Sequence, residues 1–266
     1  MKQLSTLIQQ AKLEEALGYI SNLLQEQPQD SNIRSHFIEL LCIDGQLERA
    51  DKQLNMLIKQ HPDCLVGASN LRLLIRAAQA RRDFYNGAAT ASLVREVDES
   101  FTALVSIKLA ANDDNTQLLE ESAKQLEETR KECQLVIDGI EQESLRDIDD
   151  TLAGYLEVFG TNGLYYLVPF DALIHLELKP VTSLVEQVWR KVEIDIEGGL
   201  SGEAFIPITY IESQTDAQKL GRETDWFTVN DTDVYTGVGQ KMYLFGDEAL
   251  AISSINNLNK KTICEV

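Results

Sequence analysis

The first 83 residues carry apolar side chains at helical spacing, with polar residues between them. Apolar positions recur three, four or seven residues apart, which is the pattern of a helix with one buried stripe. Pro28 and Pro62 interrupt this pattern, and a proline cannot continue the hydrogen-bond ladder of a helix. The pattern therefore predicts helices at about residues 2–10, 13–26, 30–43, 47–60 and 64–82.

The same stretch also repeats itself at an offset of 34 residues. The matched pairs are Leu13/Leu47, Glu14/Glu48, Ala16/Ala50, Ile20/Leu54, Leu23/Leu57, Leu24/Ile58 and Pro28/Pro62. This offset is the period of tetratricopeptide (TPR) repeats, in which each unit is a pair of helices joined by a turn. The small residues at Ala16 and Ala50 allow the helices of a unit to approach closely, and Gly45 lies where the second unit turns.

Phe84 stands where a third unit would need a small residue, so we expect the array to end there. A solenoid prefers at least three units, and the rest of the chain must therefore cap this one. Two helical hairpins without superhelical stacking are the alternative.

A second helical region follows the repeats. Residues 98–111 predict a further helix, and the run 112–115 (Asn-Asp-Asp-Asn) breaks it and offers an N-cap. Beyond the break we predict a long helix from about 116 to 143, because Leu119, Leu126, Cys133 and Ile140 recur every seven residues. A heptad pattern this short favours an amphipathic helix packed on a core over a coiled coil.

After residue 150 the pattern changes to short β-strands. The segment Gly160–Gly163 contains an Asn-Gly pair that suits a tight hairpin turn. We predict strands at 152–159, 164–168, 173–178, 190–196, 204–211, 226–229 and 241–245. Short strands at this spacing indicate a bent or barrel-like antiparallel sheet.

The predicted fold class is therefore α+β, with N-terminal TPR-like α-helical hairpins followed by a small, mostly antiparallel β-rich domain. We place a TPR-like helical domain at 1–111, an acidic connecting helix at 112–150 and an α+β domain with a bent antiparallel sheet at 151–266.

The net charge of −19 changes the picture of possible partners. Residues 101–266 hold 30 acidic and 13 basic side chains, whereas residues 1–100 are nearly balanced. Phosphate binding needs clustered Lys and Arg, so a nucleic-acid partner is not expected.

No apolar run approaches 18 residues and the N-terminus has no secretion signal, so no membrane association is expected. Cys42, Cys64, Cys133 and Cys264 lie far apart without a CxxC pair, which favours a reducing, cytoplasmic location.

Catalytic and cofactor motifs are weak. His36, His61 and His175 have no motif that places a nucleophile beside them, as triad chemistry requires. His61 and Cys64 are three residues apart, but no second pair of zinc ligands follows. The glycine-rich run 198–202 lacks the lysine of a phosphate-binding loop. We expect no catalytic residues, no cofactor and no metal.

One basic feature stands out, because Arg72 and Arg76 share a helix face and Arg81 and Arg82 follow. It can contact acidic side chains of a bound peptide, or it can pair with the acidic C-terminal half of this chain.

Several stretches in order along nearly the whole chain resemble the ImpE-like family, also called TagJ, accessory proteins of bacterial type VI secretion. In the N-terminal half the matching residues are Arg34, 39–42 (ELLC), Gly45, 48–50 (ERA), 53–54 (QL), 67–68 (GA), Arg72 and Arg81. In the C-terminal half they are Gly163, 168–170 (VPF), Leu184, 188–189 (VW), 220–222 (LGR), 224–226 (TDW), 239–240 (GQ) and 246–248 (GDE). The acidic segment 113–150 and the tail after Ile252 carry little of the pattern.

This resemblance implies a non-enzymatic accessory of a contractile secretion machine. Members of the family are understood to bind the N-terminal helix of the small sheath subunit. The contracted sheath of that system is recycled by an AAA+ ATPase, to which the resemblance implies at most an indirect link. Stacked helical hairpins fit this role, because their concave surface can hold an amphipathic helix or an extended peptide.

TPR geometry places the first helix of each unit along the concave surface. It predicts a partner-binding groove lined by Ser35, Glu39, Cys42, Ser69, Leu73 and Arg76.

Two rival functions come from other classes. An enzyme or small-ligand protein would hold its site in the C-terminal β domain, near the polar cluster of Arg222, Asp225, Trp226, Asp247 and Glu248. A structural subunit would instead self-associate through its long acidic helix.

Overall fold

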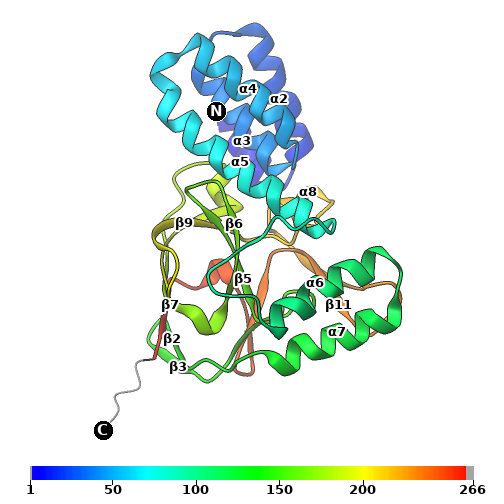
Figure 1. Cartoon of the computed structure of the whole chain (residues 1–266). Coiled ribbons are helices and arrows are strands. Elements are labelled where there is room, and N and C mark those ends of the chain that lie inside the picture. Colours follow the sequence, from blue (N-terminus) through cyan, green and yellow to red (C-terminus); the bar gives the residue numbers. More distant parts are fainter. Residues whose placement is uncertain (1, 262–266) are drawn as a thin grey trace.

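The computed structural model describes residues 2–261 and places a stack of helices at one end and a β-rich half at the other (Figure 1). The helices of the stack are α1 (Lys2–Gln9), α2 (Leu13–Glu26), α3 (Ser31–Ile43), α4 (Leu47–Gln60) and α5 (Leu65–Tyr85). Each of them packs against the next. Ala16 and Ala50 are fully buried, as the close approach of paired helices requires. These helices begin and end close to the predicted residues.

Helix α5 joins the two halves. It continues past its predicted end at residue 82 to Tyr85, because no Gly or Pro follows until Gly87. Phe84, near its end, is buried and packs against the rings of Phe101 and Tyr165, with centroids 6.4 and 6.0 Å away. The bulky residue that ends the repeat pattern is therefore the one that meets the β-rich half.

Helices α6 (Glu99–Asn112) and α7 (Thr116–Thr129) form a further pair beside the sheet, green in Figure 1. Each begins with a side-chain cap: Asp98 accepts a hydrogen bond from the Phe101 N–H, and Asn115 accepts one from the Leu118 N–H. The predicted helix at 98–111 and the break after it are confirmed.

The predicted long helix from 116 to 143 was wrong beyond Thr129. Cys133, Leu135 and Ile137 are buried alternately with more exposed neighbours, which is the period of a strand. Asp138 and Gly139 both have positive φ, 48° and 88°, and form the tight turn between β2 (Leu135–Ile137) and β3 (Ile140–Gln142). The segment 112–150 thus contains α7, the second helix of the pair, followed by short strands. It is not one acidic connecting helix. The domain boundaries at 111 and 150 stay a prediction.

Nine strands within the described residues form the main sheet, in the order β1-β6-β5-β9-β8-β7-β14-β2-β3. Besides β2 and β3 they are β1 (Ser92–Leu93), β5 (Tyr155–Gly160), β6 (Tyr165–Pro169), β7 (Leu173–Leu178), β8 (Trp189–Ile196), β9 (Ser201–Pro207) and β14 (Asn257–Lys260). Only β1 and β6 pair in parallel among them. The predicted α+β class with a mostly antiparallel sheet is confirmed.

The predicted hairpin turn at Gly160–Gly163 connects β5 and β6, with Phe159 opposite Tyr165. Gly163 has a φ of 81°, a conformation that glycine adopts without strain.

Two smaller sheets and several short helices complete residues 2–261. The sheets are β10 (Thr224–Thr228) with β11 (Tyr235–Gly239), and β13 (Glu248–Ala251) with β12 (Met242–Phe245) and β4 (Leu145–Asp147). The short helices are η1 (Pro62–Cys64), η2 (Phe170–Ala172), η3 (Val185–Gln187), α8 (Asp216–Lys219) and η4 (Ile252–Ser254).

Strand β5 of the main sheet is buried on both faces. Tyr155 and Phe159 belong to a hydrophobic cluster that includes the helical stack, whereas Leu156 and Val158 belong to a second cluster. Glu157 lies in register with Tyr155 and Phe159 and is 4 % exposed, so a carboxylate faces the helices from the middle of an apolar strand. This carboxylate organises the junction between the two halves.

No helix among residues 2–261 combines the length and the hydrophobicity needed to cross a bilayer.

Candidate functional site

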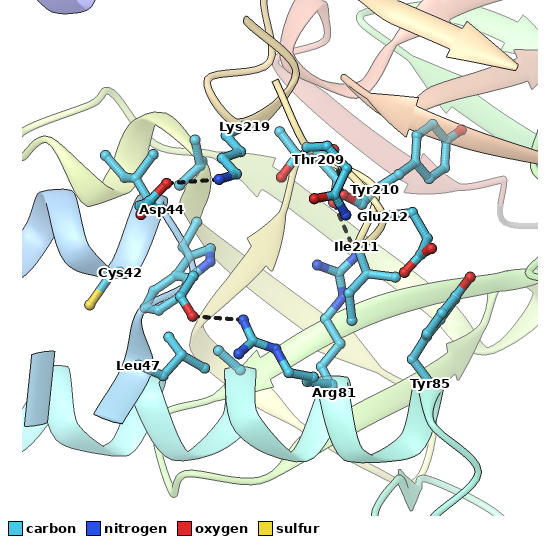
Figure 2. A pocket seen from close by; sticks show the side chains of 18 of the residues that line it. Cys42, Asp44, Leu47, Arg81, Tyr85, Thr209, Tyr210, Ile211, Glu212 and Lys219 are labelled. Atoms are coloured by element: carbon cyan, nitrogen blue, oxygen red, sulfur yellow. Dashed lines mark hydrogen bonds and ion pairs between the residues drawn. The ribbon is translucent and has the colours of Figure 1, made fainter. Parts of the chain in front are cut away.

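A cavity of about 330 Å³ lies where the helical stack meets the β-rich half (Figure 2). The α3–α4 turn supplies Asp44, helix α5 supplies Arg81 and Tyr85, and the segment after β9 supplies Glu212 and Lys219. Three distant parts of the sequence therefore form one wall each.

The polar groups of this cavity largely bond to one another. Lys219 Nζ lies 2.8 Å from Asp44 Oδ1, and Arg82 Nη2 donates to the Gly45 carbonyl at 2.8 Å. Cys42 also lines the cavity, but its side chain is buried and burial raises the pKa of its thiol. A thiol of this kind is a poor nucleophile, since the thiolate is the reactive form. The Asp44–Lys219 contact joins the helical stack to the β-rich half, whereas the Arg82–Gly45 contact lies within the stack.

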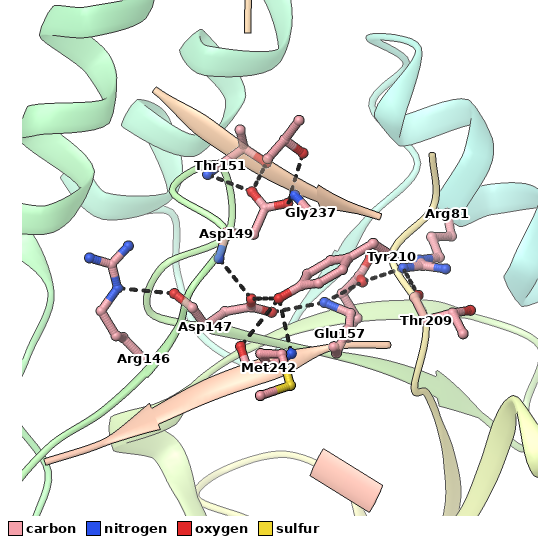
Figure 3. Close-up of polar contacts among 12 residues, drawn as sticks. Arg81, Arg146, Asp147, Asp149, Thr151, Glu157, Thr209, Tyr210, Gly237 and Met242 are labelled. Atoms are coloured by element: carbon pink, nitrogen blue, oxygen red, sulfur yellow. Dashed lines mark hydrogen bonds and ion pairs between the residues drawn. The ribbon is translucent and has the colours of Figure 1, made fainter. Parts of the chain in front are cut away.

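A buried charge network adjoins the cavity and shares Arg81 and Tyr210 with its lining (Figure 3). Arg81 donates to Glu157 from Nε at 2.7 Å and from Nη2 at 2.6 Å. Lys241, which is fully buried, lies 2.9 Å from Asp147 Oδ2 and 3.1 Å from Glu157 Oε2. The hydroxyl groups of Tyr165 and Tyr210 donate to Glu157 and Asp147 at 2.7 Å each.

The protonation of this network follows from its geometry. Burial alone would raise the pKa of Glu157, but the charges of Arg81 and Lys241 hold it well below its usual range. Burial alone would lower the pKa of Lys241, but the Asp147 charge keeps it above its usual value. The pKa shifts of Glu157 and Lys241 therefore favour their charged forms, whereas burial raises the pKa of Asp147.

Asp149 extends the network toward the helix pair α6–α7. It accepts hydrogen bonds from the N–H and hydroxyl groups of Thr151, from the Thr236 hydroxyl and from the Gly237 N–H, at 2.6 to 3.0 Å. Lys108 on α6 donates to the Thr151 hydroxyl at 2.7 Å, and burial lowers its pKa. A space of about 20 Å³ lies between these groups, enough for one water molecule. The network thus connects helices α5 and α6 to the sheets.

Two of the predicted partner-binding residues lie at this junction. The Glu39 carboxylate accepts hydrogen bonds from the Ser183 side chain and from the N–H groups of Leu184 and Val185, where η3 begins, and its pKa is raised mainly by burial. Cys42 is 3 % exposed. The β-rich half of this chain therefore covers the concave face at α3. Ser35, farther back on α3, is half-buried and donates to the Ser31 carbonyl.

The other predicted residues, Ser69, Leu73 and Arg76, follow one another along α5. A Cβ atom on Gly163 would lie 3.0 Å from Leu73 Cδ2 and 3.5 Å from Arg76 Cδ, so the β5–β6 turn rests on this part of the helix. Glu39 and Cys42 thus lie against one part of the β-rich half, and Leu73 and Arg76 lie against another. A role of these six residues in partner binding stays a prediction.

The polar cluster suggested for a small-ligand site is spread over two sheets. Arg222 and Asp225 are exposed at the start of the two-stranded sheet, and Trp226 packs on Tyr210. Asp247 and Glu248 belong to the β12–β13 turn of the three-stranded sheet. Among residues 2–261, no group of three or more His, Cys, Asp or Glu side chains is placed to hold a metal ion.

A second opening, of about 510 Å³, lies between helices α4 and α5 and the β5–β6 turn. We call it the α4–α5 groove. Helix α4 supplies Leu47 and Asp51, helix α5 supplies Ile75 and Arg76, and the β5–β6 turn supplies Leu164. The sequence pattern did not predict this groove, because its wall comes from a turn 80 or more residues away along the chain.

Two charged residues in apolar stretches of the sequence indicate the charge network. Glu157 is the one charged residue in the apolar stretch 152–160, and Lys241 is followed directly by the apolar run 242–245. A charge in such a stretch requires a buried partner.

Known proteins resemble this chain in both its helical and its β-rich half. The model of the family described as ImpE protein matches residues 139–259. The type VI secretion system accessory component TagJ of Pseudomonas aeruginosa is 25 % identical over 261 residues, which cover 95 % of this chain and 89 % of that protein.

A solved structure is similar over almost the whole chain. The crystal structure of protein VPA1032 from Vibrio parahaemolyticus is 45 % identical and superimposes with a TM-score of 0.95, covering 98 % of each chain. The helical stack, the junction and the sheets are thus shared as one arrangement. The chain thus resembles the ImpE family over residues 139–259 and TagJ over nearly its whole length, as the order of its short motifs indicated.

Proposed function

We propose that this protein is a cytoplasmic, non-enzymatic accessory of bacterial type VI secretion that binds the N-terminal helix of the small sheath subunit. Its similarity to TagJ, named as an accessory component of that system, supports the accessory role over nearly the whole chain. Helix binding is the finer part of the proposal, and it rests on the helical stack.

The single observation that carries helix binding is that α5 begins a repeat unit but, among residues 2–261, has no second helix of that unit packed beside it. Helices α1 and α2 form one unit of the repeat and α3 and α4 the next, so α5 begins a third. Within residues 2–261 no helix follows α5 as its repeat partner, because the chain passes into β1. A helix that begins a repeat unit without a second helix leaves a helix-sized position beside it.

The buried chemistry of the junction supports a binding role over a catalytic one. The acids and bases of the charge network are paired with each other, and the Cys42 thiol is buried with a raised pKa. A catalytic acid, base or nucleophile must reach its substrate. Through the sheath subunit, the protein would act only indirectly on the AAA+ ATPase that recycles the sheath.

A binding experiment with purified proteins tests the proposal. The full chain is immobilised and offered the small sheath subunit in two forms, intact and without its N-terminal helix. We expect retention of the intact form alone. A third form, with the residues of that helix in scrambled order, controls for its composition and charge. Equal recovery of all forms, or recovery of none, would contradict helix binding.

A further inference from the structure

The α4–α5 groove occupies the place of a missing helix. In the second unit of the repeat the chain turns at Gly45, and the offset of 34 puts the equivalent turn of the third unit at Gln79. Helix α5 does not turn there and continues to Tyr85. The position beside α4 and α5 that a second helix would fill is open over about 510 Å³.

The orientation of a helix in that place follows from two contacts. Arg72, early in α5, bonds to Asp51 and Asn55 of α4, whereas Arg82, late in α5, bonds to Gly45 before α4. Helices α4 and α5 are therefore antiparallel. The second helix of a repeat unit runs back along the first, so a helix in the groove would be antiparallel to α5 and parallel to α4.

The groove has an apolar floor and an apolar wall. Leu47 and Ile75 are 4 % and 6 % exposed and form the floor. Leu164, at the tip of the β5–β6 hairpin, is 38 % exposed and forms part of the wall. An apolar helix face that lay in the groove would contact this floor and cover the exposed part of Leu164.

The rim carries charges of both signs, because Glu48, Asp51 and Asp83 line it beside Arg72 and Arg76. Arg72 is occupied by Asp51 at 2.6 Å. Arg76, one turn later, is exposed and has neither an ion pair nor a hydrogen bond within residues 2–261. An unpaired guanidinium beside an apolar groove favours a carboxylate on the bound segment.

We propose that the α4–α5 groove binds one amphipathic helix of a partner protein, antiparallel to α5, which completes the third repeat unit from outside the chain. Its apolar stripe covers Leu47, Ile75 and Leu164, and an acidic side chain pairs with Arg76. The groove follows α5 from Arg72 to Asp83, so about three helical turns, roughly 16 Å, lie in it. The identity of the partner as the small sheath subunit rests on the proposed function.

Two substitutions in the groove test this binding mode. Leu164→Glu places a charge on the apolar wall, and Arg76→Glu reverses the charge at the rim. Each has a matched control outside the groove: Val66→Glu, at a position on α5 that is 73 % exposed, and Lys124→Glu, on the exposed face of α7. Affinity for a fluorescent peptide of the sheath-subunit helix is measured by anisotropy, with circular dichroism and the melting temperature checking that each variant folds.

We expect each groove variant to bind about tenfold or more weakly, as loss of an anchor residue does, while both controls bind like the unchanged protein. A folded groove variant with unchanged affinity would overturn the groove as the binding place, although the unchanged protein still binds the helix and the proposed function stands. Absence of binding by the unchanged protein would instead remove the proposed function itself.

Charge reversal on the peptide separates direct pairing from an indirect effect. Each acidic residue of the peptide is replaced in turn by lysine. We expect one replacement to restore binding to the Arg76→Glu variant and to weaken binding to the unchanged protein. Failure of every replacement to restore binding overturns the pairing at Arg76.

A photo-crosslinking residue at position 164 identifies the occupant directly. We expect it to link to the sheath-subunit helix, and the same residue at position 66 to leave that helix unlinked. Links between two copies of this chain would show that a second copy fills the groove, and would overturn the proposal.

Discussion

The guanidinium of Arg81 on helix α5 donates two hydrogen bonds, from Nε and Nη2, to the carboxylate of Glu157 on strand β5. Both side chains are less than a tenth exposed. The residues are 76 positions apart in sequence. Arg81 also donates to the Thr209 carbonyl at 3.0 Å, so one side chain connects helix α5 to strand β5 and to the segment beyond β9. It is the main charged contact between the helical stack and the sheet.

Removing one member of this pair should destabilise the fold strongly. Arg81→Met leaves Glu157 buried without its main partner, and we expect the free energy of unfolding to fall by about 3–5 kcal/mol. Arg72→Met, which breaks the exposed pair with Asp51, should cost less than about 1 kcal/mol. Urea denaturation of both variants checks the difference, and equal losses would contradict a special role of Arg81.

The pH dependence of stability should carry the signature of Glu157. Its pKa is held below the ordinary value in the folded state, so its charged form adds stability above the unfolded pKa of about 4.3. This contribution decreases as the pH falls below that value. We therefore expect the stability advantage of the unchanged protein over Glu157→Gln to be greatest near pH 7 and to shrink between about pH 5 and pH 3. An advantage that is independent of pH would show that Glu157 acts through packing alone.

Glu39 should matter for folding more than for partner binding. Glu39→Ala removes the acceptor for the Ser183 hydroxyl and for the N–H groups of Leu184 and Val185. Leaving such donors unsatisfied costs about 1–3 kcal/mol of stability. The exposed Glu26→Ala is the control and should change stability by less than about 0.5 kcal/mol. Thermal unfolding measures both, and a stable Glu39→Ala protein that fails to bind the sheath-subunit helix would favour the concave face as the binding site.

The described cysteines should differ sharply in reactivity. Cys42 and Cys133 are 3 % and 5 % exposed, and burial raises the pKa of Cys133 to about 11 and that of Cys42 further. Cys64 is half-buried. At pH 8 we expect iodoacetamide to label Cys64 at least about tenfold faster than the other two, as peptide mass spectrometry can measure, because the thiolate is the reactive form. Similar rates would show that the junction opens readily. Cys264 lies outside the described residues.

The sequence predicted the helical stack well because its signals are local. Apolar spacing, small residues and prolines act within one or two helical turns, and the offset of 34 checks each helix against another. The same logic failed at 130–143, where Cys133 and Ile140 fitted a heptad by coincidence. The Asp138-Gly139 pair is a strong signal for a two-residue hairpin turn and would have corrected it.

The repeat pattern could not predict that other segments of this chain cover the concave face of the helical stack. Repeat geometry states which residues line that face but not what covers it. Its cover comes from η3 and from the β5–β6 turn, through contacts such as Glu39 with Val185 and Leu73 with Gly163. These pairs are 90 or more residues apart, and no local pattern connects them. Strand β14 was missed for a similar reason, since its place between β7 and β2 depends on partners far along the chain.

One continuous helix, α5, contains both the last repeat segment and the guanidinium that bonds to strand β5, so no loop separates the helical stack from this contact. Tension applied to a partner held by the helical stack would pass along α5 into the middle of the sheet, where it loads many backbone hydrogen bonds at once. The helical stack and the sheet would then share the load, instead of separating first at a loop.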